Sequence, residues 1–297
     1  MRNLPEPDRT QARTTLERAL SQYQHDGVLR GYAGVPAEVD EVMALYDDYD
    51  TARGVAATEL QGPALGAGLK QALHDAYDQT QKRRRLKHVR EQVFGSTELC
   101  PVCGIDPPTE IDHVLPRSDY QALAIYVRNL VPLCHLCNHR KLAGFAEPGE
   151  LGFVHVYFDL FPDVQFLQAE VELVGAALTT TFTIDAPAVA VGDLGDRMAN
   201  IHIKLALNDR YRAEMNLYLA GQAIALHGVY HARGAAGVKA HLRGQARYET
   251  GRFYRNHWRP TLLHALVQHD AFCDGGFAEV FAVPTDVLED ALGQPTV

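Results

Sequence analysis

Two Cys-x-x-Cys pairs constrain this sequence more than any other feature. The first pair is Cys100 and Cys103, the second is Cys134 and Cys137, and thirty residues lie between the pairs. Two chelating turns that together offer four thiolates form the ligand set of a closed, tetrahedral structural zinc site. We therefore predict that these four cysteines bind Zn²⁺. Because such a site has no open coordination position, any chemistry must come from other residues of the same stretch.

Composition indicates a folded protein of a reducing compartment. The chain has 297 residues, 46% of them hydrophobic, which is enough for one large domain or two smaller ones. Four of the five cysteines fall in the two pairs, so metal binding is favoured over a disulfide framework. The sequence has no run of eighteen apolar residues, and the first residues lack the apolar segment of a secretory signal. We expect a soluble cytoplasmic protein without membrane contact.

Positive charge is concentrated around the cysteine segment. The chain as a whole carries a net charge of −9, but residues 81–145 hold ten basic and six acidic side chains. Such a local excess marks the place where a phosphate backbone would dock, although a charged run can also be a solvated helix face. We favour phosphate contact, and the candidate residues are Lys82, Arg83, Arg84, Arg85, Lys87 and Arg90 before the cysteines and Arg117, Arg140 and Lys141 among them.

Hydrophobic periodicity predicts a mixed, α+β protein. Apolar residues at three- and four-residue spacing predict helices over residues 8–29, 37–53 and 65–94. Residues 109–115 and 129–133 are typical of two short paired strands, and a helix follows from His135 to near Gly144. β-branched and aromatic residues predict a small antiparallel sheet from 153–159, 166–174 and 178–184, and helical spacing returns at 197–230, 235–248 and 258–272. We expect three regions: a helical one over 1–95 that ends in a basic helix, a central module over 96–145, and an α+β region over 146–297.

Two further clusters allow more than one interpretation. Asp47, Asp48 and Asp50 form an acidic cluster, and a solvated helix end is favoured over a metal site for it. Trp258 and its aromatic neighbours Phe253 and Tyr254 alternate with arginines, which is typical of base stacking. The core of an amphipathic helix accounts for the same aromatics equally well, and we favour it.

The polar residues between the cysteine pairs carry a family resemblance. They are Asp112-His113 with Pro116 three residues on, then Asn129-Leu130 before the second pair, and Asn138 directly after it. In order and spacing this segment of roughly 45 residues resembles the HNH endonuclease family, in its zinc-stapled form with asparagine as the third motif residue. The resemblance implies a ββα-metal fold for this module and a phosphodiester hydrolase activity.

Roles for these residues follow partly from chemistry and partly from the resemblance. Hydrolysis of a phosphodiester needs an activated water and stabilisation of negative charge, and His113 is a suitable general base because its ordinary pKa lies near neutrality. The resemblance implies that Asp112 binds a divalent ion and that Asn129 orients the base and its loop. The oxygens of Asp112 and Asn138 suit Mg²⁺ or Mn²⁺, and the part played by His139 stays open. Alternate residues of a strand point to opposite sides, so a twist or bulge must bring Asp112 and His113 to one site.

We therefore predict a metal-dependent endonuclease that acts on DNA. Two alternatives stay open: a non-catalytic zinc-stapled adaptor that binds DNA or protein, and a toxin-like nuclease that cleaves RNA. The chain also resembles effector nucleases of bacterial restriction and anti-phage defence systems, which implies an ATPase or another defence protein as partner.

Overall fold

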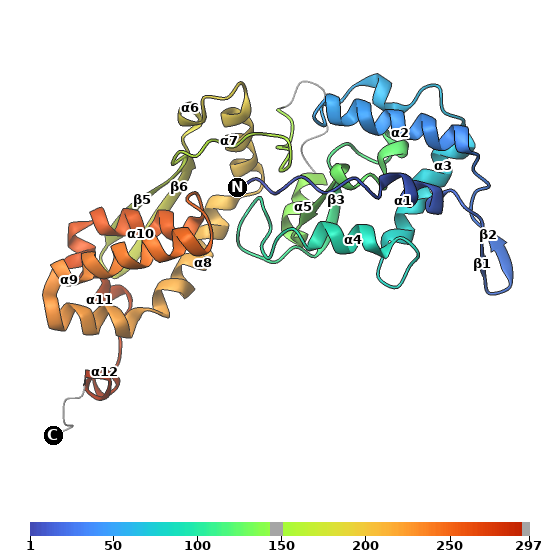
Figure 1. The fold of residues 1–297 in the computed structure, drawn as a ribbon. Helices are drawn as coiled ribbons and strands as arrows, with labels where there is room; N and C mark the ends of the chain where they lie inside the picture. Colours follow the sequence, from blue (N-terminus) through green and yellow to red (C-terminus); the bar gives the residue numbers. More distant parts are fainter. Residues whose placement is uncertain (143–150, 293–297) are drawn as a thin grey trace. The chain divides into compact units, whose positions relative to one another are not determined.

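The computed structural model describes residues 1–142 and 151–292, which form two compact units (Figure 1). The N-terminal unit comprises the described residues of Asn3–Ala143 together with Phe153–Leu160. The C-terminal unit comprises Met1–Arg2 and the described residues of Gly144–Gly152 and Phe161–Val297. The predicted three-part division of the chain stays a prediction. Within the described residues, no helix combines the length and apolar character needed to cross a membrane.

Helices are the main regular structure of the N-terminal unit. Their buried faces meet at side chains such as Tyr46, Tyr49 and Leu73, each exposed by 1% or less. The α-helices before the cysteine segment are α1 (Ala12–Ala19), α2 (Pro36–Thr51), α3 (Ala67–Ala76) and α4 (Lys87–Phe94), and the short 3₁₀ helices are η1 (Thr58–Gln61), η2 (Tyr77–Thr80), η3 (Gln121–Leu123) and η4 (Val127–Asn129).

The helix predicted over residues 8–29 is wrong in its second half. Helix α1 ends at Ala19, and a hairpin of β1 (Tyr23–His25) and β2 (Val28–Arg30) follows. Asp26 and Gly27 join the strands, with φ angles of 54° and 73°. An Asp-Gly pair supplies the two left-handed residues that a two-residue hairpin turn requires, so this turn signal overrides the helical spacing.

The helix predicted over residues 65–94 is interrupted, and the predicted basic helix is largely a loop. Helix α3 and η2 end by Thr80, and α4 begins only at Lys87. The chain turns at Arg83, where φ is 66°. Four adjacent cations at 82–85 disfavour a continuous helix because like charges repel across a helical turn.

The cysteine segment folds as two strands and a helix, which confirms the prediction for this stretch. Strands β3 (Glu110–His113) and β4 (Leu130–Leu133) pair antiparallel, with Glu110 opposite Leu133 and His113 opposite Leu130. Helix α5 (His135–Leu142) follows β4 at once. The predicted end of this helix near Gly144 lies outside the described residues.

The strand predicted at 153–159 does not form. This segment turns instead, with the Phe158 and Asp159 amides both donating to the His155 carbonyl. Its side chains do not alternate between buried and exposed, since Val154 through Phe158 are all buried. The His155 amide donates to the Asp159 carboxylate, and this bond stabilises the turn at the expense of an extended strand.

The C-terminal unit combines one antiparallel strand pair with helices (Figure 1). The predicted sheet is confirmed in two strands, β5 (Leu167–Val174) and β6 (Ala177–Ile184), joined by a turn at Gly175 with φ of 56°. The predicted helices are divided further, at Ala206 (φ 48°) and at Gly234 (φ 58°). The elements after the strands are α6 (Ala186–Val189), α7 (Leu194–Lys204), α8 (Leu207–Ala220), α9 (Ala223–Arg252), α10 (Trp258–Gln268), the π-helical turn η5 (Phe272–Gly276), α11 (Phe277–Val280) and α12 (Thr285–Leu292).

Trp258 belongs to the core of this unit. It is 2% exposed, and its ring lies against Tyr211 and Tyr218. The core interpretation of this aromatic residue is therefore the correct one, and Trp258 has no face available for a base.

Candidate functional site

The four paired cysteines form a metal centre. Their Sγ atoms all lie within 4.8 Å of one another, all four side chains are buried, and no disulfide joins them. The Sγ atoms of Cys103 and Cys134 are 3.7 Å apart. Tetrahedral zinc with Zn–S bonds of about 2.3 Å places its sulfurs about 3.8 Å apart, so the quartet suits zinc in size and in donor chemistry.

Each pair of cysteines lies where the chain turns. The Cys100 amide donates to the Asp106 carbonyl, and the chain reverses at Gly104, whose φ is 67°. Cys134 directly follows β4, and Cys137 lies in the first turn of α5. Zinc at this quartet would therefore join the loop before β3 to the start of α5.

Helix α5 lies along one face of β3. Glu110 and Asp112 are two residues apart on the strand and therefore share this face. From the helix, His135 and Asn138 contact the Glu110 carboxylate, and Lys141 forms an ion pair with Asp112. The ββα unit thus holds two carboxylates and a row of polar helix residues between its strand and its helix.

Asp112 is a desolvated carboxylate held by a single cation. Its side chain is 11% exposed, as is that of its partner Lys141. Burial raises the pKa of Asp112, and the Lys141 ammonium opposes that shift. A buried carboxylate of this kind favours a positive charge beside it, which Lys141 supplies in this structure and a divalent ion could also supply.

Asn138 leaves a buried oxygen without a partner. Its amide nitrogen donates to Glu110, but its Oδ1 atom is buried and accepts no hydrogen bond among the described residues. Since buried oxygens are normally satisfied, this atom is suited to a ligand such as a hard cation. The predicted neighbour His139 is exposed and stacks on the His135 ring, 5.9 Å between centroids.

Glu110 is a site residue that the sequence interpretation missed. It contacts both His135 and Asn138, and the hydrogen bond from His135 lowers the pKa of its carboxyl. Its position two residues before Asp112 was the available signal, because residues i and i+2 of a strand face the same side.

His113 lies on the other face of β3. The register of β3 and β4 runs through four consecutive pairs, so Asp112 and His113 point to opposite sides. The bulge considered for bringing these two side chains together does not form within this strand pair. The Nε2 atom of His113 lies 2.9 Å from the Ala124 carbonyl oxygen. A carbonyl only accepts, so Nε2 carries the proton and Nδ1 is left as the basic nitrogen. Burial lowers the pKa of His113 to about 4, which keeps the ring neutral near pH 7.

Tyr77 supports the His113 ring, a role that its sequence position did not indicate. Its ring centroid lies 4.6 Å from that of His113, and its hydroxyl donates to the Ile111 carbonyl. The Arg117 guanidinium covers the same tyrosine ring at 4.8 Å.

Asn129 links the two backbone segments that surround His113. It is 0% exposed, and its Oδ1 atom accepts from the Leu115 amide at 2.8 Å. Its amide nitrogen donates to the carbonyls of Leu115 and Leu123. Leu115 follows β3, and Leu123 precedes the Ala124 carbonyl that His113 contacts. This placement supports a positioning role for Asn129, with none of its polar atoms left for a metal.

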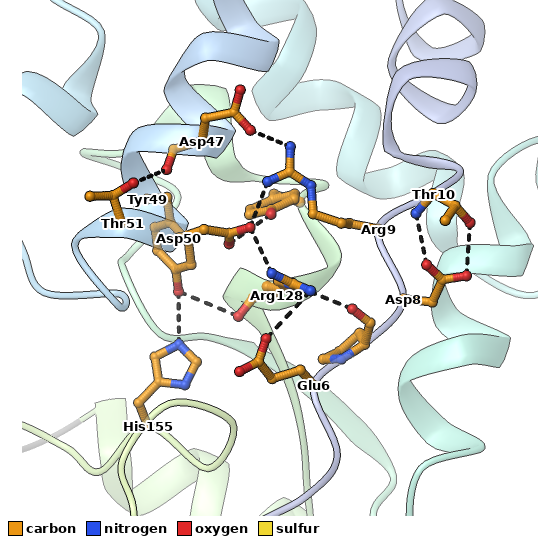
Figure 2. A network of polar contacts seen from close by, with 12 residues as sticks. Glu6, Asp8, Arg9, Thr10, Asp47, Tyr49, Asp50, Thr51, Arg128 and His155 are labelled. Atoms are coloured by element: carbon orange, nitrogen blue, oxygen red, sulfur yellow. Dashed lines mark hydrogen bonds and ion pairs between the residues drawn. The ribbon is translucent and has the colours of Figure 1, made fainter.

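A chain of hydrogen bonds reaches Asn129 from distant parts of the sequence, and Figure 2 shows its first bond, between His155 and Tyr49. The Nδ1 atom of His155 accepts from the amides of Tyr157 and Phe158, so its Nε2 carries the proton of the neutral ring. That nitrogen lies 3.0 Å from the Tyr49 hydroxyl, which in turn lies 3.2 Å from Asn129 Oδ1. His155 therefore donates to Tyr49, and Tyr49 donates to Asn129.

Tyr49→Phe is expected to lower the free energy of unfolding by about 1–3 kcal/mol, because it leaves the buried His155 N–H without an acceptor. Urea denaturation of the purified chain measures the loss. Tyr32→Phe is the matched control, since the Tyr32 hydroxyl bonds only the carboxylate of Glu38 at the surface. Equal stability of Tyr49→Phe and wild type would contradict this order of donors and acceptors.

In the acidic cluster, Asp47 and Asp48 are exposed, as a solvated helix end predicts, whereas Asp50 is held in ion pairs with Arg9 and Arg128. Asp50 accepts from Arg9, Arg128 and Tyr126, at 2.7 to 2.8 Å (Figure 2). Arg128 also donates to the Pro7 carbonyl. Helix α2 and the N-terminal segment thus hold the residue next to Asn129.

The predicted phosphate contacts before the cysteines divide into two groups. Lys82, Arg83 and Arg84 are exposed in the loop before α4, and Lys87 pairs with Glu91 on α4. Arg85 and Arg90 have structural partners: Arg85 donates to the Arg18 carbonyl, and Arg90 donates to the Thr109 carbonyl. The first three side chains are therefore the better placed for a phosphate backbone.

Lys141 differs from the exposed phosphate contact predicted for it. It is buried between Asp112 and the His113 carbonyl, because α5 packs its face against β3. Arg140, one residue earlier on the helix, is exposed, and Arg117 lies 3.6 Å from Asp78.

Comparison with known proteins agrees with this geometry. The family model described as HNH endonuclease matches residues 100–143, from the first cysteine to the end of the zinc-binding segment. No curated protein and no solved structure matches the chain. The match covers the cysteine quartet and the ββα unit and leaves the rest of both compact units unassigned.

Proposed function

We propose that the HNH endonuclease domain of this chain hydrolyses phosphodiester bonds of DNA with the help of a divalent cation. The observation that carries the proposal is the state of His113. Its ring is neutral, its Nε2–H is held by the Ala124 carbonyl, and its Nδ1 has no partner among the described residues. An imidazole in this tautomer offers Nδ1 as the acceptor for a proton from the attacking water.

Asp112 and Asn138 are the residues that would hold the catalytic cation, Mg²⁺ or Mn²⁺. The fit rests on a desolvated carboxylate at Asp112 and on the unpartnered Oδ1 of Asn138, both hard oxygen donors. When bound, the ion supplies positive charge for the phosphoryl oxygens and the departing oxygen. Lys141 balances the charge of Asp112 in this structure.

The remaining residues of the site position these groups. Asn129 holds the backbone at Leu115 and Leu123, close to His113, and Tyr49 orients Asn129. The zinc quartet, which we assign to Zn²⁺, fixes α5 and therefore Asn138 against β3. The exposed cations Lys82, Arg83 and Arg84 are proposed contacts for the DNA backbone. A role as an effector of a restriction or anti-phage defence system, with a partner such as an ATPase, stays a prediction.

Cleavage of supercoiled plasmid DNA tests the proposal. We expect nicking or linearisation with Mg²⁺ or Mn²⁺ and none without added divalent cation. Asp112→Asn is expected to lower the rate about 100-fold or more, because the carboxylate charge that binds the ion is lost. The zinc content should stay unchanged.

Asp119→Asn is the matched control, since Asp119 is an exposed carboxylate in the loop after β3. Wild-type rates for Asp112→Asn would contradict the assigned ligand. A parallel reaction on RNA of the same sequence separates the RNA-cleaving alternative, and binding without cleavage under every cation would favour the non-catalytic adaptor.

A further inference from the structure

A second concentration of positive charge lies in the C-terminal unit. Between residues 146 and 297 the chain has 11 basic and 18 acidic side chains, so this region is acidic as a whole. Residues 233–259 nevertheless contain seven of those basic side chains and a single acidic one, Glu249. The basic residues are Arg233, Lys239, Arg243, Arg247, Arg252, Arg255 and Arg259.

Helix α9 has a buried apolar face and an exposed basic face. After its break at Gly234, the helix buries Val238, Leu242, Ala246 and Glu249, which recur every three or four residues. Arg243, Arg247, Tyr248 and Arg252 are exposed on the helix surface, Tyr248 by 67%. We call these four residues the arginine face.

The one carboxylate of this segment is turned away from the arginine face. Glu249 is 4% exposed, and it accepts hydrogen bonds from Tyr218 and Gln245 inside the unit. At the flanks, Lys239 is paired with Asp270 and Arg255 with Asp163. Arg243 and Arg247 form no ion pair with any residue that the structure describes, so their charge is available to a partner.

The shape of the arginine face suits a phosphate backbone. Arg243 and Arg247 are one helical turn apart, a rise of about 6 Å, and both project from a helix anchored by its buried side. Gly244 lies between them with open space around its Cα, so an anion can approach the helix closely. Arginine forms bidentate hydrogen bonds with phosphate oxygens. Tyr248 is the one large aromatic side chain of the arginine face, whereas a membrane-binding helix would require an apolar face built from several such residues.

We propose that the arginine face of α9 binds the backbone of duplex DNA and gives the protein a DNA contact outside its HNH domain. The choice of DNA among polyanions rests on the proposed function. The proposed contact is to phosphates; Trp258, one of the aromatic residues considered for base stacking, is buried and not available to a base.

Equilibrium binding of the full-length chain tests this proposal. The probe is a fluorescent 30-bp duplex DNA, measured by anisotropy between 50 and 300 mM NaCl without added divalent cation, so that binding is read without cleavage. For the double variant Arg243→Gln/Arg247→Gln we expect at least about tenfold weaker binding at 100 mM NaCl. The slope of log K against log salt concentration should become shallower by about 1.8, the value for two lost phosphate contacts.

Two matched variants make the result specific. Arg30→Gln/Arg212→Gln removes the same charge from exposed positions on β2 and α8, and it should bind as wild type does. Arg243→Lys/Arg247→Lys keeps the charge and should restore most of the salt dependence.

The proposal is overturned if Arg243→Gln/Arg247→Gln binds DNA with wild-type affinity and slope, or if Arg30→Gln/Arg212→Gln loses as much affinity. It is also overturned if the arginine variant weakens binding to duplex RNA alone. Plasmid cleavage is a separate readout: cleavage by wild type with unchanged binding by the arginine variant rejects only the arginine face. Weakened binding with no cleavage under any cation rejects only the proposed nuclease function.

Discussion

His113→Ala is expected to lower the rate of cation-dependent DNA cleavage by about 10³-fold, within the range that general-base catalysis contributes. The substitution removes the nitrogen that takes the proton from water. Asp112, Asn138 and the cysteine quartet stay in place, so binding of DNA and of zinc should be retained. Single-turnover cleavage of plasmid DNA with Mn²⁺ or Mg²⁺ measures the rate, and anisotropy with duplex DNA measures binding.

The matched control is His139→Ala, which removes an exposed imidazole from α5. We expect its rate to stay within a few-fold of wild type, because His139 is exposed and stacks on His135. The melting temperature of His113→Ala must also be compared with wild type, because the substitution leaves the Ala124 carbonyl without its partner. Cleavage by a folded His113→Ala protein at the wild-type rate would reject His113 as the base.

Loss of zinc is expected to unfold the ββα unit and with it the cleavage activity. Cys137→Ser removes one of four buried ligands, and a quartet of three thiols and a hydroxyl binds zinc much more weakly. Zinc contributes about 10–16 kcal/mol of apparent binding free energy to isolated zinc-finger peptides. In this chain, which has a core of its own, we expect a loss of several kcal/mol in unfolding free energy. Metal analysis and urea denaturation give the two measurements.

Cys273→Ser is the control for this experiment. Cys273 is buried in the C-terminal unit, where its thiol donates to the Leu266 carbonyl, and a serine hydroxyl can form the same bond. We expect one zinc per chain in the control and in wild type, and less than one in Cys137→Ser. A full zinc content with unchanged stability in Cys137→Ser would show that the quartet is not the zinc site.

Local sequence signals were sufficient for the ββα unit. The spacing of the cysteines, the alternation around Asp112 and His113, and the helix after Cys134 all act within a few residues. Contacts of this short range depend on residues that are close in the sequence. The strands β3 and β4, the helix α5 and the grouping of the four thiols could therefore be predicted. The turn at 153–159 could not be predicted, because the apolar side chains there are buried against other segments and do not indicate the conformation of the backbone.

The errors in the predicted helices arise at turns. The hairpin after α1 depends on two left-handed residues at Asp26 and Gly27, and the break before α4 depends on a left-handed Arg83. Hydrophobic periodicity indicates which side chains are buried, and it carries no information on residues with a positive φ angle. The Asp-Gly pair carried a usable signal, whereas Arg83 carried none, since arginine has no preference for a positive φ.

The sequence by itself determined the family resemblance, the four zinc ligands and the chemical types available for catalysis, because spacing and residue identity are sufficient for these. The tertiary structure determined which side chains come into contact. Tyr49 and His155, 106 residues apart, reach Asn129 only in the folded chain. Folding also buries Lys141 and Glu249 while it exposes Arg243 and Arg247. The physical reason is that hydrogen-bond partners and solvent exposure depend on how the elements pack, and one-dimensional spacing does not contain that information.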